Sequence, residues 1–227
     1  MRSRKPKADR SILQRTLVYF PIIHTPADMG ALGKDVKLLT VKKLGRESWK
    51  RKVELTNKMW TDIENAIDRL DLSCEKLRLY QDGLPVCGRE VEIVKDIAKA
   101  GSPNHQLLLR LQEKGATIMG TVSWDLLVEE YELTKQIMSA REGFKAGETD
   151  PRLQSLADSL LRRRDQYIGN LINGTLLFGE TGIIFLGLLH SLENRLDKNI
   201  RIVYPLNRPL GHRGGLNGKA ETPNSRR

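Results

Sequence analysis

The stretch IIFLGLLHSLEN, from Ile183 to Asn194, decides the predicted fold, because its apolar run stops at a histidine that a hydroxyl residue follows. The stretch VYFPIIHTPAD, from Val18 to Asp28, has the same order of residue types near the N-terminus. Apolar runs of this length, bounded by polar residues, are typical of buried strands. The two stretches therefore predict two strands that each end at a histidine.

Strand and helix patterns alternate along the rest of the chain. Strand-like composition marks five segments, which are residues 17–23, 76–81, 116–120, 182–187 and 200–204. Apolar residues recur at helical spacing in the segments between them, which are residues 56–70, 90–100, 103–114, 124–138 and 151–177. Strands that alternate with helices of this length form parallel sheets with crossover helices. We therefore predict a single α/β domain with a mostly parallel sheet of about five strands.

The net charge of +10 is concentrated at the two ends of the sequence. Residues 1–15 and 206–227 together hold 11 basic and two acidic side chains, whereas residues 16–205 hold 27 basic and 26 acidic ones. We predict flexible basic tails at 1–15 and 206–227 around a domain at 16–205. A dedicated nucleic-acid domain carries a basic face within its fold, whereas such tails contact a polyanion non-specifically. Nucleic acid is therefore expected to bind only weakly, through the tails.

The sequence lacks the marks of a membrane or exported protein. Its longest apolar run, residues 182–189, is far shorter than the roughly 18 to 20 residues that span a bilayer. The basic N-terminal stretch is not followed by an apolar segment with a cleavage site. Cys74 and Cys87, the two cysteines, have neither zinc-ligand spacing nor the pattern of a disulfide framework. We expect a cytoplasmic protein with no membrane association.

His24 and His190 each follow a predicted strand. Open parallel sheets bind ligands outside the carboxyl ends of their strands, where loops lead into helices. Thr25 and Ser191 suit the N-cap of such a helix, so the predicted order at both places is strand, histidine, cap and helix. Two neutral imidazoles that meet at one sheet edge can bind a divalent metal or act as acid and base. The alternative is that each histidine is only a hydrogen-bonded residue at a strand end.

Arg164 and Asp82 are the candidate catalytic residues. Arg164 lies on the apolar stripe of the helix predicted at 151–177, and a buried guanidinium needs an anionic or carbonyl partner. It either clamps an anionic group or holds a catalytic carboxylate in an ion pair, unless its head reaches solvent along the stripe. Asp82, in LYQDGLP, follows the second predicted strand and ranks first among the carboxylates, the alternative being an aspartate that only forms a turn.

Other polar residues have simpler interpretations. Ser123 is expected to cap a helix, and Glu129 and Glu130 are expected to be solvated within it. His105 opens a helix and is assigned no role. The sequence contains no GxSxG motif and no Ser-His-Asp set identifiable by spacing. It also contains no Walker loop or GxGxxG motif, so nucleotide binding by those two devices is not expected.

Three short patches together resemble the TraB/Tiki superfamily, which is marked by paired Gly-x-x-His motifs and by an arginine-bearing helix before the second motif. They are GLLH at Gly187–His190, RRDQYIGNLI at Arg163–Ile172 and PIIH at Pro21–His24. The superfamily includes metal-dependent peptidases. The resemblance implies that His24 and His190 are the paired motif histidines, that they hold a divalent metal ion, and that Arg164 is the helix arginine. Pro21 stands where the first motif has glycine, and Asp82 stands where a glutamate is expected.

Three functions are compatible with these residues. The first is a hydrolase of a small molecule or peptide, in which His24, His190 and a carboxylate hold a metal that activates water, and Arg164 stabilises the developing negative charge. The second is a non-catalytic protein that binds a small anion or cofactor at the same edge. The third is a nucleic-acid accessory protein that acts through its basic tails.

Overall fold

A computed structural model describes residues 14–28, 32–140 and 150–206 of the chain. Its five strands form one parallel sheet; they are β1 (Arg15–Ile22), β2 (Leu77–Gln81), β3 (Thr117–Met119), β4 (Thr181–Gly187) and β5 (Ile200–Val203). The order across the sheet is β3-β2-β4-β1-β5. The predicted α/β fold with five parallel strands is confirmed. The predicted tails, apart from residues 14, 15 and 206, lie outside the described residues.

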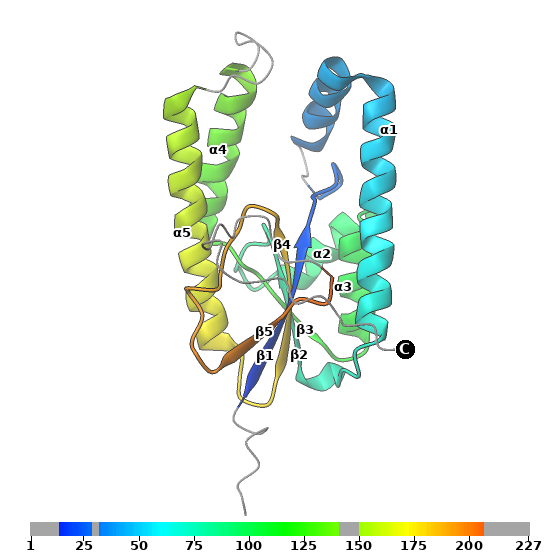
Figure 1. Cartoon of the computed structure of the whole chain (residues 1–227), viewed down its shortest axis with the longest axis vertical. Coiled ribbons are helices and arrows are strands. Elements are labelled where there is room, and N and C mark those ends of the chain that lie inside the picture. Colours follow the sequence, from blue (N-terminus) through cyan, green and yellow to red (C-terminus); the bar gives the residue numbers. More distant parts are fainter. Residues whose placement is uncertain (1–13, 29–31, 141–149, 207–227) are drawn as a thin grey trace, which may run out of the picture.

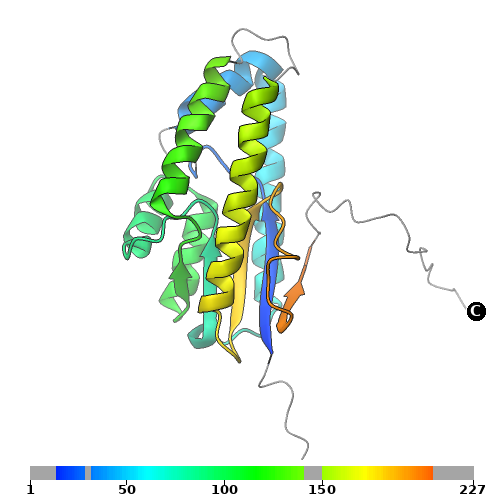
Figure 2. The same ribbon diagram turned by 90° about the vertical axis from the view of Figure 1, so that its left-hand side faces the viewer.

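Helices cover both faces of this sheet (Figure 1). They are α1 (Leu32–Asp68), the short 3₁₀ helix η2 (Cys74–Lys76), α2 (Glu90–Lys99), α3 (Pro103–Glu113), α4 (Trp124–Ala140) and α5 (Pro151–Thr175). The helices α1, α2 and α3 lie on one side of the sheet, and α4 and α5 lie on the other (Figures 1 and 2). The upper parts of α1, α4 and α5 extend beyond the carboxyl ends of the strands (Figure 1). No described helix is both long and apolar enough to span a bilayer.

The central strands β1 and β4 are buried on both faces, which explains their apolar runs. In β1, Phe20 points into a core that it shares with Trp60 of α1, whereas Tyr19 points into a core that it shares with Ile168 of α5. Successive side chains of a strand point to opposite faces, so an apolar residue is needed at every position. Each fully buried side chain of this size contributes about 1.5–3 kcal/mol to folding.

The register of the sheet brings three strand ends to one place. Ile22, the last residue of β1, pairs with Gly187, the last residue of β4. Gln81, the last residue of β2, pairs with Phe185 of β4. Because all three strands run in the same direction, the loops that follow them leave the sheet at the same edge.

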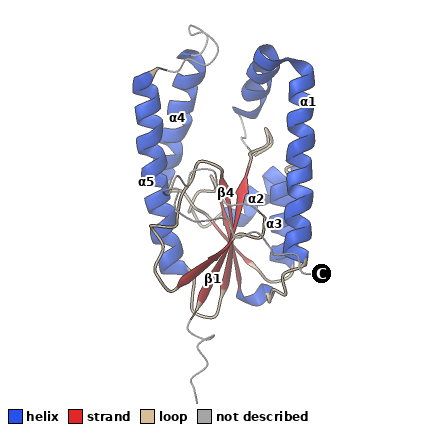
Figure 3. Cartoon of the chain, in the orientation of Figure 1, coloured by secondary structure: helices blue, strands red, loops and turns tan. Residues whose placement is uncertain are grey.

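The loops after β1 and β4 are turns rather than the predicted helix starts (Figure 3). Residues 26–28 form a turn in which the N–H of Thr25 donates to Oδ2 of Asp28 at 2.6 Å and the N–H of Asp28 donates to Oγ1 of Thr25 at 3.3 Å. The helix that follows is described from Leu32. Ser191 caps no helix, because its N–H donates to Asp165 and the chain turns toward β5. Thr25 therefore caps a turn as predicted, but no helix begins directly after it, and neither the cap nor the helix predicted after His190 is present.

The predicted apolar stripe of α4 does not face the core. Trp124 and Tyr131 are exposed, whereas Leu126 and Leu133 are buried against Leu160 of α5. The helix α4 packs on α5 rather than on the sheet. Its buried face is therefore narrow and is centred on Leu126 and Leu133 rather than on Trp124 and Tyr131. The helix predicted at 56–70 is the second part of α1, which changes direction at Gly45, where φ is 81°.

Candidate active site

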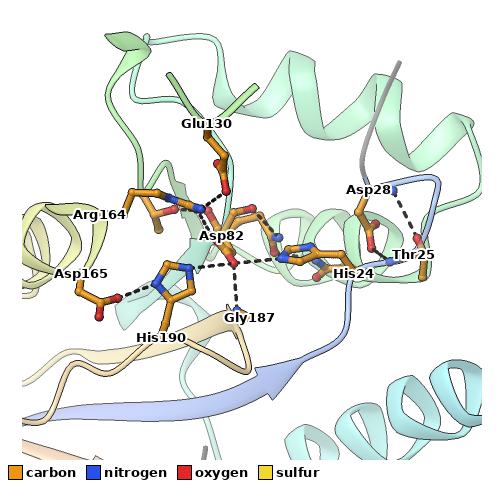
Figure 4. Close-up of polar contacts among 12 residues, drawn as sticks. His24, Thr25, Asp28, Asp82, Glu130, Arg164, Asp165, Gly187 and His190 are labelled. Atoms are coloured by element: carbon orange, nitrogen blue, oxygen red, sulfur yellow. Dashed lines mark hydrogen bonds and ion pairs between the residues drawn. The ribbon is translucent and has the colours of Figure 1, made fainter. Parts of the chain in front are cut away.

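Three side chains from three other parts of the sequence meet at the carboxylate of Asp82 (Figure 4). Arg164 donates from Nη2 to Oδ1 at 2.5 Å. Oδ2 lies 3.0 Å from Nε2 of His24 and 3.7 Å from Nε2 of His190, and it accepts a hydrogen bond from the N–H of Gly187 at 2.9 Å. The structure thus brings together all four residues that the sequence singled out, His24, Asp82, Arg164 and His190, around one carboxylate.

Two hydrogen bonds and a tight turn fix the backbone around Asp82. The Asp82 N–H donates to the carbonyl of Phe185, which continues the pairing of β2 with β4 beyond the last strand residue. Gln81 is fully buried; its side chain donates to the carbonyl of Asp82 at 3.1 Å and accepts from Asn104 at 2.8 Å. Gly83 follows with φ of 72°, a conformation that favours glycine, so the predicted turn is present. The turn directs the carboxylate toward the two histidines and Arg164.

Asp82 carries a buried negative charge. Burial alone raises the pKa of this carboxyl, but the charges of His190, Arg164 and His24 outweigh burial and hold the pKa well below its usual value of 3.8. Its side chain is only 2% exposed. An ionised carboxylate can only accept hydrogen bonds, so the groups that point at it must carry protons.

His190 is held in one orientation. It is buried, and its Nδ1–H donates to Oδ1 of Asp165 at 2.5 Å. The other oxygen of Asp165 accepts from the N–H of Ser191 at 3.2 Å. Sequence reasoning missed Asp165, although it stands three residues before Ile168 and seven before Ile172, at the spacing of an apolar helix face. A carboxylate at such a position signals a buried partner.

The ring of His24 is hydrogen-bonded through only one of its two nitrogens within the described part of the chain. Its Nε2–H donates to Asp82, whereas its Nδ1 has no hydrogen-bond partner among the described residues. Its side chain is 33% exposed, against 5% for His190. Burial lowers the pKa of His24, but the hydrogen bond and the charge of Asp82 outweigh burial and raise the pKa above its ordinary value of 6.5. His24 therefore presents one free imidazole nitrogen while Asp82 orients the ring.

Arg164 links two carboxylates. Its guanidinium also bonds to Glu130 through Nη1, and its side chain is buried, so the expectation that its head reaches solvent is wrong. Glu130 is only partly solvated, because its carboxylate bonds to Arg164 and its side chain is 36% exposed. Burial raises the pKa of Glu130 although Arg164 opposes the shift. Its neighbour Glu129 is solvated as predicted and pairs with the exposed Arg163. Of the two alternatives for Arg164, the geometry corresponds to an ion pair that holds a carboxylate.

A second polar cluster lies on the other side of His24. Ser102 donates from Oγ to Asp28, and Nδ1 of His105 lies 2.8 Å from the same Oγ. Burial raises the pKa of Asp28, but hydrogen bonds from His105, Ser102 and Thr25 outweigh it and lower the pKa. Because Asp28 also holds the turn at Thr25, this cluster fixes the loop that carries His24. No local pattern predicts this pairing, because Asp28 and Ser102 are far apart along the chain.

A cavity of about 230 Å³ opens onto both clusters. Its polar walls come from His24, Asp28, Asp82, His105, Glu130, Thr134 and Arg164. Its apolar walls come from Leu84, Ile93, Ile97, Leu127 and Tyr131, which belong to the loop after β2 and to helices on both sides of the sheet. Leu127 and Tyr131 are two of the apolar residues of α4 at helical spacing, and both line this cavity. A concave site with an apolar wall and a few converging polar groups is the usual form of a ligand-binding site.

The side chains that meet at Asp82 do not fit a metal ion in this arrangement. Oδ2 of Asp82 occupies the point toward which both Nε2 atoms are directed, and the Nε2 of His24 carries the proton that a metal ligand must lack. Oδ1 is already paired with Arg164. Within residues 14–28, 32–140 and 150–206, no three His, Cys, Asp or Glu side chains are arranged to hold a metal ion. The divalent metal stays a prediction.

No family model, curated protein or solved structure matches the chain. The resemblance to the TraB/Tiki superfamily therefore stays a prediction, and the function has to be argued from the site itself.

Proposed function

We propose that the chain is a hydrolase of a small-molecule or peptide substrate, in which His24 is the general base. The observation that carries this proposal is the pair formed by His24 and Asp82. A buried ionised carboxylate bonds to one imidazole nitrogen at 3.0 Å, and the other nitrogen is free at a cavity. A carboxylate that bonds to the ring nitrogen opposite the basic one holds the tautomer of the ring and stabilises the imidazolium that forms during the reaction.

The proposed reaction uses water and a carbonyl substrate. Nδ1 of His24 removes a proton from a water molecule, and the water oxygen attacks the carbonyl carbon of an ester or amide. The imidazolium of His24 then returns the proton to the leaving oxygen or nitrogen as the carbon–heteroatom bond breaks. General acid–base catalysis of this kind contributes about 10²–10⁴-fold to the rate.

The other residues have supporting roles in this proposal. Arg164 positions Asp82 rather than the substrate, because each of its two terminal nitrogens already bonds to a carboxylate. The same pairing means that Arg164 does not offer an unpaired positive charge to the small anion of the alternative binding protein. Because the donor set does not fit a metal, no step of the proposed reaction uses one. The nucleic-acid alternative depends on tails that lie almost entirely outside the described residues.

The test is hydrolysis of p-nitrophenyl acetate and of aminoacyl p-nitroanilides by wild type, His24→Gln and Asp82→Asn. We expect each variant to lose about 10²-fold or more of the rate. The wild-type rate should rise with pH through an inflection above 6.5, because the base must be neutral and its pKa is raised. Glu129→Gln, which alters an exposed ion pair, is the matched control and should keep the wild-type rate.

A parallel experiment separates this proposal from the metal-dependent one. Wild type and its His24→Ala and His190→Ala variants are dialysed against a chelator and titrated with Zn²⁺ and Mn²⁺. Activity that survives chelation supports the proposed reaction. Stoichiometric metal uptake that both histidine variants lose, together with activity only in the loaded protein, would refute it in favour of the metal-dependent hydrolase.

A further inference from the structure

A second cavity, of about 160 Å³, lies beside the first and shares His24 with it. The loop after β1 forms one wall, with Thr25, Pro26 and Ala27. The helix α1 forms another wall, with Trp49, Lys52, Val53, Thr56 and Asn57, and the start of α3 closes it with Gly101 and Pro103. His24 is the one residue that lines both of these cavities, so its ring stands where they meet.

The two cavities differ in charge. The first contains three carboxylates, those of Asp28, Asp82 and Glu130. Its basic groups are the imidazoles of His24 and His105 and the guanidinium of Arg164, which is paired with Asp82 and Glu130. Glu130 is the most accessible of the three carboxylates, since its side chain is 36% exposed whereas the other two are 2% exposed. A cationic group that enters the first cavity therefore meets the carboxylate of Glu130.

The second cavity has the opposite character. Apart from His24, its lining includes one ionisable side chain, Lys52, and no Asp or Glu. Lys52 is exposed, and it forms no ion pair within the described part of the chain. Trp49 and Val53 supply an apolar surface next to it. An anionic group that enters this cavity can pair with Lys52 without competition from a neighbouring carboxylate.

We propose that the two cavities form one bipartite site for a zwitterionic amide or ester. The cationic end lies in the first cavity near Glu130, the carboxylate end lies in the second near Lys52, and the scissile bond lies at His24. This inference rests on the proposed function for its reaction step. Water adds to the carbonyl carbon, the bond to nitrogen or oxygen breaks, and each product keeps one of the two charged ends.

The test uses four versions of one dipeptide, Leu-Phe, as the probe: unblocked, N-acetylated, C-amidated, and blocked at both ends. Binding is measured by chemical-shift titration, and hydrolysis is measured by release of free amine. We expect the unblocked peptide to bind about tenfold or more tightly than either singly blocked form, because one charge-assisted contact is lost each time. The doubly blocked form should bind most weakly.

Two variants separate the two ends. Lys52→Gln should remove only the preference for a free carboxylate, and Glu130→Gln should remove only the preference for a free amine. Glu130→Gln keeps the oxygen that accepts from Arg164, and Lys52 is exposed, so both variants are expected to fold. Lys58→Gln on the same helix and Glu129→Gln on α4 lie outside both cavities and should change neither preference.

The outcomes distinguish the two proposals. Equal binding of all four peptides, no binding of any, or equal loss of both preferences in each variant would overturn the bipartite site. Charge-selective binding without hydrolysis would support the bipartite site and refute the hydrolase. Hydrolysis without charge-selective binding would support the hydrolase and refute the bipartite site.

Discussion

His24 and His190 stand in nearly the same sequence context and at the same edge of the same sheet, yet the fold treats them differently. His190 is buried, with Nδ1 bonded to Asp165 and Nε2 directed at Asp82. His24 is one-third exposed and bonds only through Nε2. The difference shows that the end of a strand brings a histidine to the edge of the sheet. The elements packed around it decide whether both ring nitrogens face hydrogen-bonding partners or one stays exposed.

The helices on the two sides of the sheet explain the difference. On one side α5 supplies Asp165, which closes over His190 (Figure 4). On the other side the loop after β1 is held by Asp28 and Ser102, which support its backbone and leave the His24 ring facing two cavities. We therefore assign positioning to His190 and proton transfer to His24.

Replacing each histidine by alanine should give the largest contrast. His190→Ala leaves the buried Asp165 without its imidazole partner and should lower the free energy of unfolding by about 2–4 kcal/mol. His24→Ala should lower it by less than about 1 kcal/mol, because Asp82 keeps Arg164 and the N–H of Gly187 and the ring is partly exposed. Urea denaturation measures both values. Equal losses of stability would remove the distinction between the two histidines.

Substitution of Gly187, which lies between the two rings, should have an intermediate effect. A Cβ there would lie 3.2 Å from Oδ2 of Asp82 and 3.6 Å from an atom of each ring. Its φ is not positive, so alanine is tolerated by the backbone and only space opposes it. Gly187→Ala should cost about 1–3 kcal/mol and reduce hydrolysis of the p-nitrophenyl probe.

The matched control for this change is Gly174→Ala in α5, where a Cβ would meet no atom within 4 Å. It should be neutral or stabilise the helix by up to about 1 kcal/mol. If Gly187→Ala changed neither stability nor activity, the close contact between Gly187 and Asp82 would not be needed for folding or hydrolysis.

The pH dependence of stability should give the smallest effect. The pKa of His24 is raised in the folded state, so its pairing with Asp82 stabilises the protein fully below pH 6.5 and progressively less as pH rises through the folded-state pKa. The stability difference between wild type and His24→Gln should therefore be largest below pH 6.5 and fall at alkaline pH, within about 1 kcal/mol. A difference that grew with pH would mean that the pKa of His24 is lowered by folding.

The sequence predicted the strands and the residues that follow them better than it predicted the partners with which those residues form hydrogen bonds and ion pairs. The five strands follow from short apolar runs, and Asp82, His24 and His190 follow from their place after strand ends. Asp165 stands at the spacing of an apolar helix face, which indicates a buried partner but not which residue that partner is. Glu130 and His105 could not be identified in the same way, because neighbouring helix carboxylates such as Glu129 and Glu130 have the same local pattern whichever residue faces them.

The sequence by itself determined a parallel sheet and the edge at which its polar residues gather, because burial on both faces demands apolar runs and parallel strands end together. Only the tertiary structure decided that His190 is buried and hydrogen-bonded to Asp165, that the ring of His24 is partly exposed, and that Arg164 forms an ion pair with Asp82. Those properties depend on which helix packs over which loop, and such contacts join residues that are far apart in the chain. Hydrogen bonding and burial of a side chain are set by these neighbours, which local sequence patterns do not encode.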